Sequence, residues 1–195
     1  LLEIGVDIVA MQDALQQLGV PDVRLQHETV QRGPFSATHF HVETPTEAHP
    51  HRKWSDIKQL ILRSDLSEGV KRRSLSVFQR IAEAEAVTHG IDVEDVHFHE
   101  VGAWDSIADI VSVAVALDAL NITRIVASPP PLSSGTISSA HGQMPLPAPA
   151  TLKLLEGWPV RTGAPGREST TPTGAGILAA LAEPGQIPEM TILKT

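Results

Sequence analysis

Proline and glycine are distributed unevenly along the chain, which limits where long helices and strands can form. Residues 129–195 contain 19 of the 29 prolines and glycines, and residues 1–128 contain the other 10. Proline fixes φ and lacks an N–H donor, and glycine weakens helices and strands, so both residues interrupt regular structure. We therefore expect a single domain over residues 1–195, with a regular core in 1–128 and a loop-rich section in 129–195 packed on it.

The composition excludes several classes of protein. The chain has no cysteine, which excludes disulfide frameworks, zinc ribbons, iron–sulfur centres and thiol nucleophiles. It has nine histidines, so any transition-metal site must be built from imidazole and carboxylate ligands. The net charge of −8 argues against nucleic acid or a membrane as a partner, and no apolar run approaches the roughly 20 residues that span a bilayer. The chain starts without Met or a basic signal segment, so we expect a cytoplasmic protein that lacks its natural N-terminus.

The hydrophobic pattern indicates an α+β fold, a mixed α/β protein in which helices pack on a mixed sheet. The runs 23–31 and 36–43 predict an N-terminal β-hairpin with a short connecting loop. Side chains of a strand point alternately to its two faces, so His39 and His41 are expected on the same face.

A βαβ unit is predicted from strands over 93–102 and 122–127 and from a helix over 105–120, which is apolar on most sides. Ser67 and Asp105 are the expected N-caps of their helices. Further helices are expected at 6–18, 54–63, 67–89, 150–155 and 174–181, and a further strand at 159–162.

The segment from His97 to Asp109 holds the densest set of candidate metal ligands. His97 and His99 are two residues apart on a predicted strand, so both rings leave one face. Asp105 and Asp109 are four residues apart at the start of a predicted helix, so their carboxylates lie one turn apart. Residues 82–109 contain eight acidic residues and no Lys or Arg, a charge balance typical of a cation site. The four side chains together predict a site for Ni²⁺, Mn²⁺ or Zn²⁺.

Structural roles stay open for each of these residues taken singly. Asp105 is also explained as a helix cap, and His97 and His99 as histidines bonded to the backbone. The histidines of two predicted loops also have two possible roles each. His49 and His51 fit an auxiliary metal-collecting loop or a solvated loop, and His141 fits a site or an exposed loop.

A run of small residues before an apolar helix predicts an anion site. Residues 169–176 read Ser-Thr-Thr-Pro-Thr-Gly-Ala-Gly, so the backbone can approach a ligand closely at a helix N-terminus. Thr171, Thr173 and Gly174 are the candidate phosphate contacts, and Arg167 is near enough in sequence to add a charge-assisted contact. A plain capped turn is the alternative, and the Walker pattern is absent.

Several of these motifs together resemble one known family. The run His97–Ala103, followed by Asp105–Ile107 and Asp109–Val111, resembles the signature of the LarC family of nickel insertion proteins. These proteins mature the nickel-pincer nucleotide cofactor of lactate racemase. The likeness continues in the same order through Ala140–Gly142, Pro145–Ala150 and Thr171–Ala175, and so covers most of the chain.

The resemblance implies that nickel is inserted into pyridinium-3,5-bisthiocarboxylic acid mononucleotide, with CTP and Mg²⁺ or Mn²⁺. The substrate would supply the thiolates that this chain lacks. Family members also have a Gly-rich N-terminal segment and a CTP-binding C-terminal domain, which are not found in this sequence, so the chain resembles the N-terminal domain. The implied partners are the mononucleotide, the nucleotide-binding domain or a separate chain that carries it, lactate racemase apoprotein, and a second copy of this chain.

These features favour a nickel insertase, a lyase-class enzyme that forms a bond between nickel and a ring carbon. Forming that bond requires loss of a ring proton, and Glu100 and His141 are the candidate bases. Two other functions fit the same residues. One is a non-catalytic nickel storage or scaffold module that uses the histidines of residues 39–51, and the other is a metal-dependent phosphohydrolase.

Overall fold

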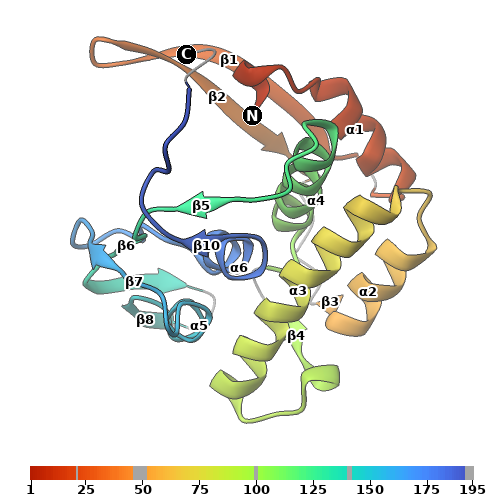
Figure 1. Cartoon of the computed structure of the whole chain (residues 1–195). Helices are drawn as coiled ribbons and strands as arrows, with labels where there is room; N and C mark the ends of the chain where they lie inside the picture. Colours follow the sequence, from red (N-terminus) through yellow and green to blue (C-terminus); the bar gives the residue numbers. More distant parts are fainter. Residues whose placement is uncertain (21, 46–51, 99–100, 140–141, 192–195) are drawn as a thin grey trace.

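A computed structural model describes residues 1–20, 22–45, 52–98, 101–139 and 142–191 (Figure 1). Its helices are η1 (Leu2–Ile4), α1 (Ile8–Gln17), α2 (Trp54–Arg63), α3 (Glu68–His89), η2 (Val93–Asp95), α4 (Trp104–Ala119), α5 (Pro149–Leu154) and α6 (Pro172–Leu181). Its strands are β1 (Arg24–Arg32), β2 (Phe35–Glu43), β3 (Arg52–Lys53), β4 (His97–Phe98), β5 (Val126–Ala127), β6 (Pro131–Leu132), β7 (Gly135–Ser139), β8 (Gly142–Leu146), β9 (Arg161–Thr162) and β10 (Glu183–Pro184). The protein is an α+β protein, as predicted. None of the helices in these described ranges is long and apolar enough to cross a membrane.

The described strands pair two by two instead of forming one mixed sheet. The pairs β1–β2, β3–β4 and β7–β8 are antiparallel, and the pairs β5–β10 and β6–β9 are parallel. The predicted βαβ unit is therefore wrong, because the strands before and after α4 belong to different pairs. Among the described residues of the predicted strand 93–102, only His97 and Phe98 form a paired strand. The segment just before them forms the turn η2, and Gly102 lies so close to Phe98 that an added Cβ would be 2.8 Å from its carbonyl oxygen.

The predicted hairpin is confirmed. Strands β1 and β2 pair in continuous register from Arg24↔Glu43 to Arg32↔Phe35, and Gly33 adopts the positive φ of 60° that the two-residue loop requires. On one face of β2, Phe40 packs against the hydrophobic core. On the other face His39 and His41 are exposed, with their ring centroids 6.2 Å apart.

The ends of the helices follow local sequence signals, with one exception. The Ser67 hydroxyl accepts a hydrogen bond from the Val70 N–H (3.2 Å), as expected of the N-cap of α3. The prediction that Asp105 caps α4 is wrong, because the helix begins at Trp104. Asp105 lies inside the first turn, where a carboxylate interacts favourably with the helix dipole, and it accepts from the Ser106 N–H (2.8 Å).

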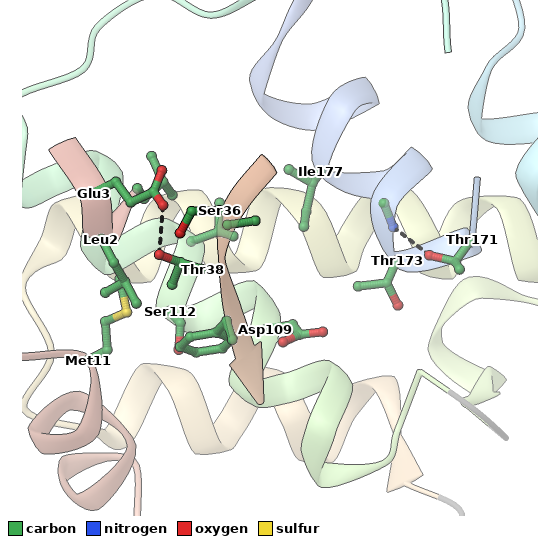
Figure 2. A pocket seen from close by; sticks show the side chains of 15 residues that line it. Leu2, Glu3, Met11, Ser36, Thr38, Asp109, Ser112, Thr171, Thr173 and Ile177 are labelled. Carbon is green, nitrogen blue, oxygen red and sulfur yellow. Dashed lines mark hydrogen bonds between the residues drawn. The ribbon is translucent and has the colours of Figure 1, made fainter. Parts of the chain in front are cut away.

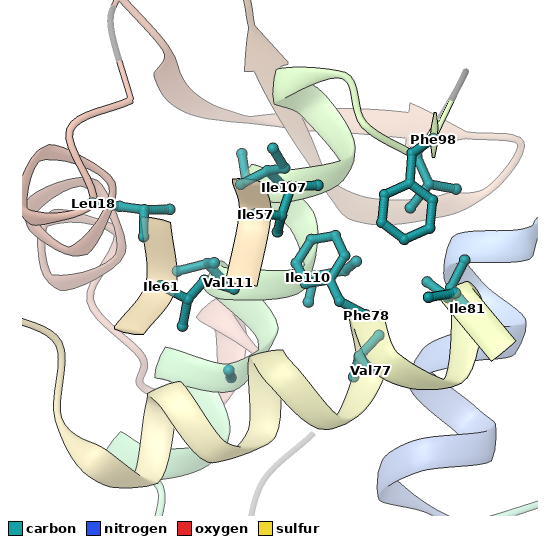
Figure 3. Close-up of a cluster of buried hydrophobic side chains, with 14 of the residues drawn as sticks. Leu18, Ile57, Ile61, Val77, Phe78, Ile81, Phe98, Ile107, Ile110 and Val111 are labelled. Atoms are coloured by element: carbon teal, nitrogen blue, oxygen red, sulfur yellow. The ribbon is translucent and has the colours of Figure 1, made fainter. Parts of the chain in front are cut away.

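Helix α4 lies at the centre of the packing. It contacts α1, α3, α6 and β2, and most of its residues are buried. Figure 3 shows its aliphatic side chains meeting those of α2 and α3 around the ring of Phe78, which lies 6.2 Å from the ring of Phe98. Helices α5 and α6, from the loop-rich section, pack against α3. Burial on so many sides leaves α4 little freedom to move, so side chains on its remaining faces have well-defined positions.

The contact between α6 and α3 gives the first testable prediction. A Cβ added at Gly176 would lie 2.5 Å from Cγ1 of the fully buried Ile81, so Gly176→Ala forces the two helices apart. We expect the free energy of unfolding to fall by about 1–3 kcal/mol, measured by urea denaturation. Gly174→Ala is the matched control, because its Cβ would meet only Thr171 Oγ1 at 3.5 Å. An equal loss in both variants would contradict the tight contact.

Candidate functional site

A cavity of about 590 Å³ lies where β2, α4, η1 and the start of α6 meet (Figure 2). Pockets for small ligands commonly measure about 300–1,000 Å³, so a small-molecule ligand fits this volume. The cavity is lined by residues from four separate parts of the chain: Leu1, Leu2, Glu3, Met11, Ser36, Ala37, Thr38, Phe40, Asp109, Ser112, Val113, Thr171, Thr173, Gly174 and Ile177.

The cavity brings together two groups of residues that the sequence predicted separately. Asp109, from the predicted metal set, faces it from α4, and Thr171, Thr173 and Gly174, the predicted phosphate contacts, face it from α6. Figure 2 shows the Asp109 side chain, from α4, on the side of the cavity towards Thr173 of α6. The Thr171 hydroxyl caps α6 by accepting a hydrogen bond from the Gly174 N–H (3.1 Å), which holds this turn in place.

Carboxylates are the charged groups in the cavity lining. Glu3 accepts a hydrogen bond from the Thr38 hydroxyl (2.7 Å), while Asp109 is exposed and has no hydrogen-bond partner among the described residues. Burial of the Asp109 carboxyl group disfavours its charged form, and the negative charge of the nearby Asp105 adds a smaller effect in the same direction. Both effects raise the pKa of Asp109 above its ordinary value of 3.8. Among the described lining residues there is no Lys or Arg. This charge balance favours a cation.

Ser112 is a lining residue that the sequence analysis missed. It lies on α4 and is 4% exposed, and its Oγ has no hydrogen-bond partner among the described residues. The signal was available in the sequence: Ser112 follows Asp109 by three residues on a mostly apolar helix, so the two side chains share a face.

Arg52 braces the start of α4. Its Nη1 donates a 2.6 Å hydrogen bond to the Gly102 carbonyl, and its guanidinium lies 3.5 Å from the centroid of the Trp104 ring. Partial burial lowers the pKa of Arg52. This brace holds the start of α4, the helix that carries Asp109.

The remaining predicted ligands are spread more widely. His97 is exposed on β4, opposite Lys53, and neither His97 nor the exposed Asp105 lines the cavity. Arg167 is also exposed and away from the lining. Five predicted site residues lie outside the described part of the chain: His49, His51, His99, Glu100 and His141. Within the described part, no three His, Asp or Glu side chains form a group that could hold a metal ion. The four-residue metal site stays a prediction.

Comparison with known proteins gives a consistent result. Residues 1–195 match the model of the family described as "Nickel insertion protein". The chain is 47% identical over 195 residues to a Myxococcus xanthus protein, and 47% identical over 197 residues to a Geobacter metallireducens protein. These alignments cover 99% and 98% of this chain and 50% of each relative, and both relatives carry the name "Putative nickel insertion protein". The chain thus spans about half the length of these curated relatives. No solved structure matches it significantly.

The raised pKa of Asp109 predicts a pH-dependent cost in stability. A carboxyl group whose pKa is higher in the folded state stabilises the fold while it is protonated, and that stabilisation is lost as the pH rises through the folded pKa. We therefore expect Asp109→Asn to have a higher melting temperature than wild type at pH 7, with the difference closing below pH 3.8. Asp13→Asn, at an exposed position on α1, is the control. A lower melting temperature for Asp109→Asn at pH 7 would contradict this prediction.

Proposed function

The chain belongs to the nickel insertion protein family, and from this membership we propose that it inserts Ni²⁺ into pyridinium-3,5-bisthiocarboxylic acid mononucleotide. The observation that carries the proposal is the cavity shared by Asp109 of α4 and Thr171–Gly174 of α6. It pairs a carboxylate for a cation with a helix N-terminus for a phosphate, and the proposed reaction needs both.

The phosphate would bind at the start of α6. This helix runs over ten residues, and the first N–H groups of a helix form a partial positive charge that attracts phosphate. The hydroxyl of Thr173 adds a donor in the cavity wall. With the phosphate here, the rest of the nucleotide extends along α4 towards Asp109 and Ser112 (Figure 2).

The nickel would be held between protein and substrate. Asp109 offers a carboxylate oxygen, and the predicted partners His97, His99 and Asp105 precede it closely in sequence. Thiolates are the softer ligands and belong to the mononucleotide, so the substrate competes well for the ion. Formation of the Ni–C bond releases a ring proton, which needs a base; Glu100 and His141 are the candidates.

The CTP-dependent part of the reaction, with Mg²⁺ or Mn²⁺, is assigned to the half of the relatives' sequences that the alignment with this chain does not cover. In this proposal the second half acts as a fused domain or as a separate chain, and lactate racemase apoprotein receives the product. The activity is a lyase-type metal insertion, and this chain supplies the binding site for nickel and the mononucleotide.

Nickel affinity tests the proposed site. We expect Asp109→Asn, and the double variant His97→Ala/His99→Ala, each to weaken Ni²⁺ binding at least tenfold in calorimetric titrations, because each removes a proposed ligand. The control is His39→Ala/His41→Ala on the outer face of the hairpin, which should bind Ni²⁺ as wild type does. Unchanged affinity in the first two variants would exclude the site.

The same variants separate insertion from the two alternatives. If the chain only stores nickel, the His39→Ala/His41→Ala variant loses nickel, while single-turnover insertion with the added nucleotide-binding half proceeds in the Asp109→Asn variant. If it is a phosphohydrolase, wild type with Mn²⁺ releases phosphate from model esters. The proposal expects neither result.

The phosphate end of the cavity gives a separate prediction. Thr173→Ala combined with Gly174→Ala should weaken mononucleotide binding about tenfold, the effect of losing one hydrogen bond to a charged group, and leave Ni²⁺ affinity unchanged. The Gly174 substitution is tolerated sterically, since its nearest neighbour would lie at 3.5 Å. Calorimetry with each ligand measures both affinities. Unchanged mononucleotide affinity would remove the start of α6 from the site.

A further inference from the structure

Ser112 has a buried hydroxyl group that the protein itself does not satisfy. Its side chain is 4% exposed, and Oγ has no hydrogen-bond partner among the described residues. A serine inside a helix commonly bonds to the carbonyl one turn earlier, but this bond is absent here. Buried polar groups in folded proteins are nearly always paired, so an orphaned hydroxyl on a residue that lines a cavity points to a ligand, which the enclosed Oγ would reach by rotation of the side chain about its Cα–Cβ bond.

The surroundings of Ser112 are apolar and suit an aromatic ring. Ser112 lines the cavity together with Leu2 and Met11, and Figure 2 shows these three side chains close together, away from the Thr171–Thr173 turn. We name this group, Leu2, Met11 and Ser112, the ring end of the cavity. The thioether of Met11 is buried, and thioether sulfur makes favourable contacts with aromatic rings.

Asp109 lies between the ring end and the start of α6 (Figure 2). A pyridinium mononucleotide has matching parts in the same order: a phosphate, a cationic ring nitrogen, and acyl groups on the far side of the ring. Asp109, halfway along the cavity, then lies beside the bound ring. A hydroxyl donor in the apolar wall fits a carboxyl or thiocarboxyl group, which accepts hydrogen bonds.

We infer that Ser112 donates a hydrogen bond to a carboxyl or thiocarboxyl group on the pyridinium ring, and so selects ring-substituted mononucleotides. This inference rests on the proposed function and adds a specificity determinant to it. The hydrogen bond fixes the ring's rotation about its bond to the ribose. A defined rotation would fix the directions in which the two thiocarboxyl groups leave the ring, and so the place where their sulfur atoms can hold nickel.

Three probes separate the two ends of the cavity. They are nicotinic acid mononucleotide, which has one ring carboxyl group; N-ribosylpyridinium 5′-phosphate, which has none; and ribose 5-phosphate, which lacks the ring. We expect wild type to bind the first probe about tenfold more tightly than the second, the value of a hydrogen bond to a charged group. In Ser112→Ala this preference should vanish, and affinity for ribose 5-phosphate should not change.

Ser74→Ala is the matched control. Ser74 is also a buried helical serine whose Oγ has no described partner, but it lies on α3 and does not line the cavity. We expect this variant to keep the tenfold preference. Thermal unfolding of both variants checks that they are folded.

The outcomes are distinguishable. If Ser112→Ala keeps the preference for the ring carboxyl group, Ser112 is not the donor and the inference fails, while the proposed function stands. If wild type binds none of the probes, or binds the two ring-bearing probes equally, the inference fails as well. Absence of all binding also overturns the proposed mononucleotide site.

Discussion

The burial of α4 is the contact on which the rest of the structure depends. This helix packs against α1, α3, α6 and the hairpin strand β2, so it connects the first hairpin to the last long helix. Each aliphatic side chain that it buries contributes about 1.5–3 kcal/mol. Where the packing stops, on the face between β2 and the start of α6, the cavity begins. The position of the cavity is therefore a consequence of how the core is filled.

The same packing explains why polar groups face the cavity. Asp109 and Ser112 are three residues apart on α4, so they share a face of the helix, and this face borders the cavity. Strand β2 contributes Ser36, Thr38 and Phe40 from a single face, because side chains alternate along a strand. A carboxylate and an unpaired hydroxyl in such a wall reduce the stability of the free protein. Such local costs are typical of binding sites, where the ligand supplies the missing interactions.

Local signals predicted the local structure well. The limits of α2, the Ser67 cap and the hairpin agree with expectation because residues a few positions apart determine them. Pairing of strands depends on distant segments, so the βαβ unit was wrongly predicted: β4 takes its partner from β3, and β5 from β10. For the candidate site, the sequence proposed Asp109 and Thr171–Gly174 but did not predict that they line one cavity, and it did not propose Ser112. Residue order along the chain does not show which faces of α4 and α6 meet.

The lack of cysteine acquires a chemical meaning in the light of the proposed function. A protein that hands nickel to a substrate must hold the ion less tightly than the product does. Carboxylate and imidazole ligands meet this condition, because the thiolates of the mononucleotide form the stronger bonds to a soft or borderline ion. A cysteine in the lining would compete with the substrate for nickel and slow its transfer. The charged side chains of the cavity lining are carboxylates, and the sequence contains no thiol. These ligands would allow nickel to pass from the protein to the substrate.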